Sequence, residues 1–133
     1  MPDERDKTIA ATPLVIDLSA IEDLADGDPA VEAELIAMFV RHTVEAIASG
    51  RCAIDSGQPQ DIARIAHTCI GFTSTLGLTT LIPTLRALER ATFAPALENP
   101  AAEELTQLIE RWEREFQRVA QALHALTDRS AAG

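Results

Sequence analysis

The segment from Pro100 to about Leu126 constrains the fold most, because its apolar residues recur with the period of an α-helix. A helix with one apolar stripe has to bury that stripe against other elements. No segment of the chain shows the sustained alternation of apolar and polar residues that is typical of a β-strand. The sequence therefore predicts an all-α fold. The stripe residues step by three or four positions: Leu105, Leu108, Trp112, Phe116, Val119, Leu123 and Leu126.

Prolines and glycines mark where the other helices should begin and end. Proline suits the first position of a helix, where its missing N–H has no intrahelical partner. Each of Asp28-Pro29, Gln58-Pro59 and Asn99-Pro100 fits a helix start, with Asp28 and Asn99 as N-caps. Glycine is common just after the last helical residue, and the candidate stops are Gly50, Gly57 and Gly77. The predicted helices span about residues 18–24, 29–49, 59–76, 78–92 and 100–126.

Short connections between amphipathic helices favour an antiparallel four-helix bundle, here with a short extra N-terminal helix. A helical fold of another kind is the alternative. Pro83 predicts that the fourth long helix starts late or bends, because proline removes one backbone hydrogen bond. We expect a flexible N-terminal arm over residues 1–12, the helical bundle over 13–128 and a C-terminal tail over 129–133.

Composition narrows the class of partner. The chain carries 21 acidic and 11 basic residues, a net charge of −10, and only 4% of its residues are aromatic. Nucleic acids and anionic membranes are therefore poor partners, since both require positive charge. Cys52 and Cys69 form neither a disulfide framework nor a zinc-ligand pattern, so we expect no metal and no cofactor. Without a secretion signal or a long apolar run, the chain is expected to be a cytoplasmic monomer.

His67 stands out in the third predicted helix. At about 100° per residue it lies opposite the apolar stripe and should be exposed. Gly71, one turn later, costs about 1 kcal/mol relative to alanine inside a helix, and close approach of a partner would explain it. Ordinary solvation of His67, close helix packing at Gly71 and a covered boundary position for Ile70 are the simpler alternatives. The stripe comprises Ile62, Ile65, Cys69, Phe72 and Leu76.

The block from Ala66 to Gly77, A-H-T-C-I-G-F-T-S-T-L-G, resembles the signature of the histidine phosphotransfer (HPt) family of two-component phosphorelays. That signature reads roughly A-H-x-L-K-G-S-x-x-x-L-G. The likeness extends over about residues 28–126. It continues into a helix that ends in Leu-Glu, matched here by Leu81, Leu85, Leu88 and Glu89.

The resemblance implies a four-helix bundle whose exposed histidine, here His67, is the phosphoacceptor. Such proteins carry a phosphoryl group to or from the aspartate of a response-regulator receiver domain and have no autonomous catalysis. The partners would be a receiver domain, a hybrid sensor histidine kinase or both, and the receiver would supply the Mg²⁺. The expected contact ring around His67 comprises Ala63, Arg64, Ile70, Gly71 and Ser74.

Ile70 departs from the family pattern, which has a lysine three residues after the histidine. A cation there would neutralise phosphoryl charge, and Arg64 is only a partial substitute because its side chain leans the other way. The lost lysine leaves open a binding module that docks on a receiver or kinase without carrying phosphate. A structural adaptor, in which another helix covers His67, is a third possibility. We expect ordinary surface or boundary roles for His42 and His124.

Overall fold

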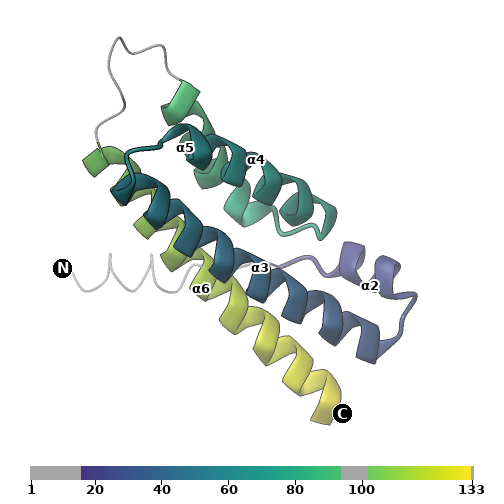
Figure 1. Ribbon diagram of the computed structural model, residues 1–133. Coiled ribbons are helices and arrows are strands. Elements are labelled where there is room, and N and C mark those ends of the chain that lie inside the picture. Colours follow the sequence, from purple (N-terminus) through teal and green to yellow (C-terminus); the bar gives the residue numbers. More distant parts are fainter. Residues whose placement is uncertain (1–15, 94–101, 133) are drawn as a thin grey trace, which may run out of the picture.

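The computed structural model describes residues 16–93 and 102–132, and every regular element in this part of the chain is helical (Figure 1). The all-α prediction is therefore confirmed for these residues. The predicted arm at 1–12 and the Asn99-Pro100 helix start lie outside them. The elements are α2 (Ser19–Ala25), α3 (Pro29–Asp55), α4 (Gln60–Thr75), the 3₁₀ turn η1 (Thr79–Leu81), α5 (Ile82–Phe93) and α6 (Ala102–Ala132).

Helix α3 runs through Gly50, so the predicted end near residue 49 is wrong. Gly50 is buried, and a Cβ atom there would lie 3.1 Å from Cδ1 of Ile109 on α6. The glycine therefore lets two helices approach closely instead of stopping one. The helix ends at Asp55, and Gly57 follows in a left-handed conformation with φ of +70°. Glycine suits that conformation because it has no side chain to clash with the backbone.

The other helix boundaries lie closer to the predictions. Asp28 is the N-cap of α3, and its carboxylate accepts a hydrogen bond of 2.9 Å from the backbone N–H of Ala30. Gly77, with φ of +75°, ends α4. Helix α5 begins at Ile82, with Pro83 in its first turn, which is the late start expected from the proline. Helix α6 continues to Ala132, so residues 129–132, expected as a tail, are helical.

The helices α3, α4, α5 and α6 form a closed ring in which each packs against two others. Helix α3 contacts α4 and α6, and α5 also contacts α4 and α6, while α2 packs against α3. Figure 1 shows α3 beside α6. Arg51 on α3 and Glu113 on α6 form an ion pair of 2.6 Å, which raises the pKa of Arg51 and lowers that of Glu113. The Thr84 hydroxyl donates a 2.5 Å hydrogen bond to Glu115 and joins α5 to α6.

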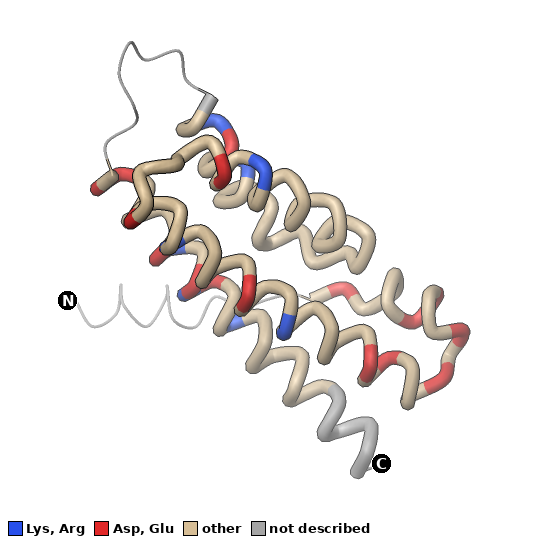
Figure 2. The backbone as a smooth tube through the Cα atoms, in the orientation of Figure 1, with Lys and Arg blue, Asp and Glu red and all other residues tan. Residues whose placement is uncertain are grey.

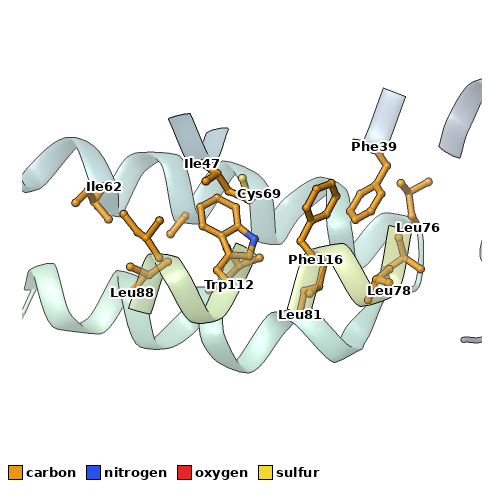
Figure 3. Close-up of a cluster of buried hydrophobic side chains, with 14 of the residues drawn as sticks. Phe39, Ile47, Ile62, Cys69, Leu76, Leu78, Leu81, Leu88, Trp112 and Phe116 are labelled. Carbon is orange, nitrogen blue, oxygen red and sulfur yellow. The ribbon is translucent and has the colours of Figure 1, made fainter. Parts of the chain in front are cut away.

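Apolar side chains from all of these helices meet in one core (Figure 3). Phe39 contacts Phe116 edge to face at a centroid distance of 5.6 Å, and Trp112 is 1% exposed. The Cys69 thiol lies in the same cluster, and burial raises its pKa to about 12. Within the described residues, none of the helices combines the length and apolar character needed to cross a membrane.

Candidate functional site

Helix α4 places His67 on the side that faces away from the core. The side chain of His67 is 78% exposed, in agreement with the helical-wheel prediction. The alternative in which another helix covers the imidazole is therefore wrong. The buried face is rotated relative to the predicted stripe, because Ile65 and Phe72 are only half-buried whereas Ala66 is fully buried. The buried residues of α4 are Ile62, Ala63, Ala66, Cys69 and Thr73.

Glu89 on α5 holds the His67 ring. Its Oε2 atom lies 2.8 Å from Nδ1 of His67, and the carboxylate side chain is 21% exposed. An ionised carboxylate only accepts hydrogen bonds, so Nδ1 carries the proton in this pair. The lone pair of the neutral imidazole is then on Nε2. The contact thus selects one tautomer and one ring orientation while leaving most of the ring open to solvent.

The contact between His67 and Glu89 could not be predicted directly from the sequence. Glu89 follows Leu88, a core position of α5, and the sequence indicates Glu89 only through the Leu-Glu pair of the family pattern. A polar residue beside a buried stripe is typical of any amphipathic helix. Its approach to His67 depends on how α5 packs against α4, which helical periodicity does not reveal.

A shallow hollow of about 580 Å³ lies between α4 and α5 beside the imidazole. Arg64 stands at its edge with a side chain that is 76% exposed, and a single 3.4 Å contact ties it to Asp61. This cation is held weakly, because exposed ion pairs of this kind contribute about 0–1 kcal/mol. The hollow is lined by Gln60, Ala63, Arg64, His67, Thr68, Glu89 and Thr92.

The predicted contact ring is only partly accessible. Ala63 is 6% exposed, so it lines the hollow as a buried wall and offers little surface to a partner. Ile70 is half-buried and packs against the core, as expected for a boundary residue and not for an outward apolar contact. Gly71 and Ser74 are exposed.

Gly71 faces open space. A Cβ atom added there would meet no atom of the described residues within 4 Å, so close helix packing does not explain the glycine. Alanine would fit sterically and would favour the helix. The remaining explanation offered by the sequence is close approach of a partner to the surface beside His67.

The other histidines and the cysteines form no competing centre in the described part of the chain. His42 is exposed and its ring lies 6.1 Å from that of Phe72, while His124 is exposed on α6. Cys69 is buried and His67 exposed, so these two cannot share a metal ion. Among the described residues, no group of three or more His, Cys, Asp or Glu is arranged to hold a metal.

Comparison with known proteins adds no family, since no family model, no curated protein and no solved structure matched this chain. The chemistry of the His67 surface is therefore the basis for assigning a function.

Proposed function

We propose that the protein is an HPt-type phosphorelay carrier that accepts a phosphoryl group on His67 and passes it to or from the aspartate of a receiver domain. One observation carries the proposal: an imidazole in the middle of α4 is 78% exposed while a carboxylate from α5 holds its Nδ1 atom at 2.8 Å. The carboxylate orients a ring that would otherwise be free to rotate in solvent. The arrangement supports a nucleophile that is both oriented and accessible.

The transfer step uses the Nε2 lone pair. Nε2 attacks the phosphorus of an aspartyl phosphate on the receiver in line, and a nitrogen–phosphorus bond forms as the oxygen–phosphorus bond breaks. The leaving electron pair stays on the receiver's aspartate, which becomes a carboxylate. No proton has to move, because Nδ1 already carries one toward Glu89. The reverse step returns the phosphoryl group to a receiver.

Glu89 has a second effect during this step. As Nε2 bonds to phosphorus, the ring gains positive charge, and the carboxylate 2.8 Å from Nδ1 stabilises it. A hydrogen bond to a charged group contributes about 1.5–3 kcal/mol. Glu89 is therefore a positioning and charge-stabilising residue that never touches the phosphoryl group. This role agrees with a carrier whose partner provides the rest of the catalytic machinery.

The fold supports the same proposal. The ring of pairings among α3, α4, α5 and α6 fits the antiparallel four-helix bundle that the sequence predicts, with α2 as the short extra helix. In such a bundle, the exposed face of α4 is available to a second protein along its length. We propose the same cytoplasmic setting as for other phosphorelay components.

Ile70 favours a second candidate function, a binding module that docks on a receiver or kinase without carrying phosphate. Its side chain carries no charge and packs against the core, and the cation Arg64 on the same helix contacts Asp61 at 3.4 Å. Phosphoryl oxygens on His67 would then depend on charge from the partner. A module of this kind would bind a receiver in the absence of any transfer.

Incubation with a panel of purified, phosphorylated receiver domains separates the two candidates. The carrier model predicts an acid-labile label on the wild type that disappears in His67→Gln and persists in His124→Gln, a matched substitution of an exposed histidine on α6. Tight receiver binding by an unlabelled wild type would favour the binding module. Labelling of His67→Gln at the wild-type level would refute the site.

A further inference from the structure

A second depression, distinct from the hollow beside Glu89, lies between α2, α3 and α4 and has a volume of about 510 Å³. Its walls are mostly apolar, and two large apolar side chains at its edge are exposed: Leu24 on α2 at 53% and Met38 on α3 at 45%. Exposed apolar surface gathered in one place is typical of a contact with another element. We refer to this depression as the α2–α4 groove. The lining residues are Leu24, Leu35, Met38, Phe39, His42, Thr68, Phe72, Thr75 and Leu76.

The acids around the groove limit what can cover it. Between residues 19 and 34 the chain carries six acidic residues and no lysine or arginine. Figure 2 shows acidic positions gathered on α2 and the start of α3. A second copy of this chain would bring the same acids and a net charge of −10 to the contact, and like charges across an interface disfavour association. The occupant should therefore be apolar and free of acidic side chains.

The segment of residues 8–15, which precedes the described part of the chain, has this character. Its sequence T-I-A-A-T-P-L-V contains no charged side chain and three large apolar ones, Ile9, Leu14 and Val15. Pro13 favours an extended chain around it, which suits a segment that lies along a groove. Residues 94–101 also lie outside the described part, but α5 ends and α6 begins at the end of the bundle opposite α2 (Figure 1). Residues 8–15 are therefore the better candidate.

The position of Asp17 brings this segment to the groove. A Cβ atom at Gly77 would lie 3.6 Å from the backbone oxygen of Asp17, and Gly77 directly follows the groove residue Leu76. The chain therefore enters the described part at the end of the groove that Leu76 lines. Thr68 lines the groove eight residues earlier in α4, which is about 12 Å along the helix. Eight extended residues span about 26 Å, so the segment is long enough to cover the groove.

A segment of the same chain needs few contacts to cover the groove. Ile16 and Leu18 pack against the core, so the end of the segment that adjoins α2 is already held in place. Attachment at this point gives the rest of the segment an effective concentration of the order of mM. Weak apolar contacts are then sufficient, whereas a separate protein would need a larger interface.

We propose that residues 8–15 lie in the α2–α4 groove and cover Leu24 and Met38. The covered surface extends to the imidazole, because Thr68 lines both the groove and the hollow that contains His67. A protein donor that approaches His67 therefore has to displace the segment, whereas a small donor does not. This consequence for phosphotransfer rests on the proposed function, and the placement of the segment does not.

A spin label on the segment of the full-length chain tests its placement. Ala10→Cys in a Cys52→Ser background carries the nitroxide, since the remaining Cys69 is buried. The proposal predicts strong paramagnetic broadening of the Met38 methyl signal. The signals of Thr106 should stay sharp, because Thr106 lies near the start of α6, at the far end of the bundle from α2 (Figure 1).

Matched substitutions identify the contacts that hold the segment. Ile9→Asn with Leu14→Asn removes two apolar side chains without adding charge, and Thr8→Asn with Thr12→Asn is the control. Broadening at Met38 should be lost with the first pair and kept with the second. Equal broadening in the wild type and the first pair, or none in the wild type, would overturn the placement. Broadening of an isotope-labelled chain by a separate spin-labelled copy would show that a second copy occupies the groove instead.

Phosphotransfer tests the consequence at His67. If the segment covers the groove in about four molecules of five, the variant with Ile9→Asn and Leu14→Asn should accept phosphate from a receiver about fivefold faster than the wild type at low receiver concentration. Labelling by phosphoramidate, a small donor, should be equal in the two proteins. An unchanged receiver rate in a variant that has lost the broadening would overturn the covering role.

The outcomes separate this proposal from the proposed function. If a receiver labels His67 but the spin label leaves the Met38 signal sharp, the segment proposal is wrong and the carrier function stands. If broadening at Met38 depends on the apolar pair but no donor ever labels His67, the segment lies in the groove and the carrier function is wrong.

Discussion

The Nδ1 atom of His67 lies 2.8 Å from Oε2 of Glu89, although these residues come from different helices and are 22 positions apart in the chain. The contact leaves 78% of the imidazole side chain exposed. Orientation and accessibility are normally in conflict, because most groups that fix a side chain also cover it. Here a half-buried carboxylate on α5 fixes one edge of the ring and leaves the other available.

Glu89→Gln should slow phosphotransfer about tenfold to a hundredfold, because the amide keeps the shape of the side chain and loses the charge that stabilises the phosphorylated ring. Transfer rates from a phosphorylated receiver provide the measurement. The ¹⁵N shifts of the imidazole should show a preference for the Nδ1–H tautomer in the wild type that weakens in the variant.

Glu104→Gln, an exposed substitution on α6, is the control for this change. A purely structural role for Glu89 would alter stability without changing the tautomer. Unchanged imidazole shifts in Glu89→Gln would therefore contradict the positioning role.

Ile70→Lys should lengthen the lifetime of phosphorylated His67. The new side chain would leave the core boundary and extend its ammonium toward solvent, on the face of α4 near the imidazole. An exposed charge pair contributes up to about 1 kcal/mol, which corresponds to about fivefold in rate. The half-life of the phosphorylated protein in buffer measures the effect, and Ile70→Met controls for the loss of packing. Equal half-lives in the lysine and methionine variants would show that charge at this position is irrelevant.

Gly71→Ala should stabilise the fold by about 0.5–1 kcal/mol, since alanine is the better helix former and nothing in the described structure obstructs a Cβ atom. Gly77→Ala should destabilise it, because Gly77 has φ of +75° and a Cβ atom there would lie 3.3 Å from that of Ala20. Urea unfolding followed by the fluorescence of buried Trp112 measures both changes.

A partner that approaches Gly71 closely would add a second effect. Gly71→Ala should then transfer phosphate more slowly in spite of its greater stability. If the alanine variant binds receivers and transfers phosphate like wild type, the glycine is not there for a close contact.

The buried Cys69 thiol should make the folded protein less stable at high pH. Burial raises its pKa from 9.0 to about 12, so above pH 9 the unfolded state loses a proton that the folded state keeps. The stabilising contribution is fully present below pH 9 and is lost as the pH rises toward 12. Unfolding free energies from pH 8 to 11, compared with those of Cys69→Ala, measure the difference.

The same burial predicts that iodoacetamide modifies exposed Cys52 in the folded protein and reaches Cys69 only after unfolding. Mass spectrometry of the peptides distinguishes the two sites. Rapid modification of Cys69 in native buffer would be inconsistent with its place in the core.

The helical class and the exposure of His67 could be predicted from the sequence because both follow from local periodicity. The start of α3 at Asp28-Pro29 and the late start of α5 at Pro83 also follow from rules that act within one turn. The end of α3 could not be predicted in this way. Gly50 has the local signature of a stop, yet its role depends on Ile109, which lies on another helix.

For the candidate site too, the sequence predicts what depends on one helix and does not predict what depends on contacts between helices. The helical wheel correctly places His67 on the side of α4 opposite the core. It also places Ala63 and Ile70 on the exposed side, whereas Ala63 is buried and Ile70 is half-buried in the structure. The partnership of His67 with Glu89 arises from packing between α4 and α5. No spacing rule within one helix contains that information.

The most direct measurement is phosphopeptide mass spectrometry and ³¹P NMR of the protein after exposure to a phosphorylated receiver. The proposed carrier function predicts a single acid-labile phosphoryl group bonded to Nε2 of His67, absent from His67→Gln and present in His124→Gln. A wild-type protein that stays unmodified with every receiver and with phosphoramidate, or that carries the phosphoryl group on another residue, would contradict it.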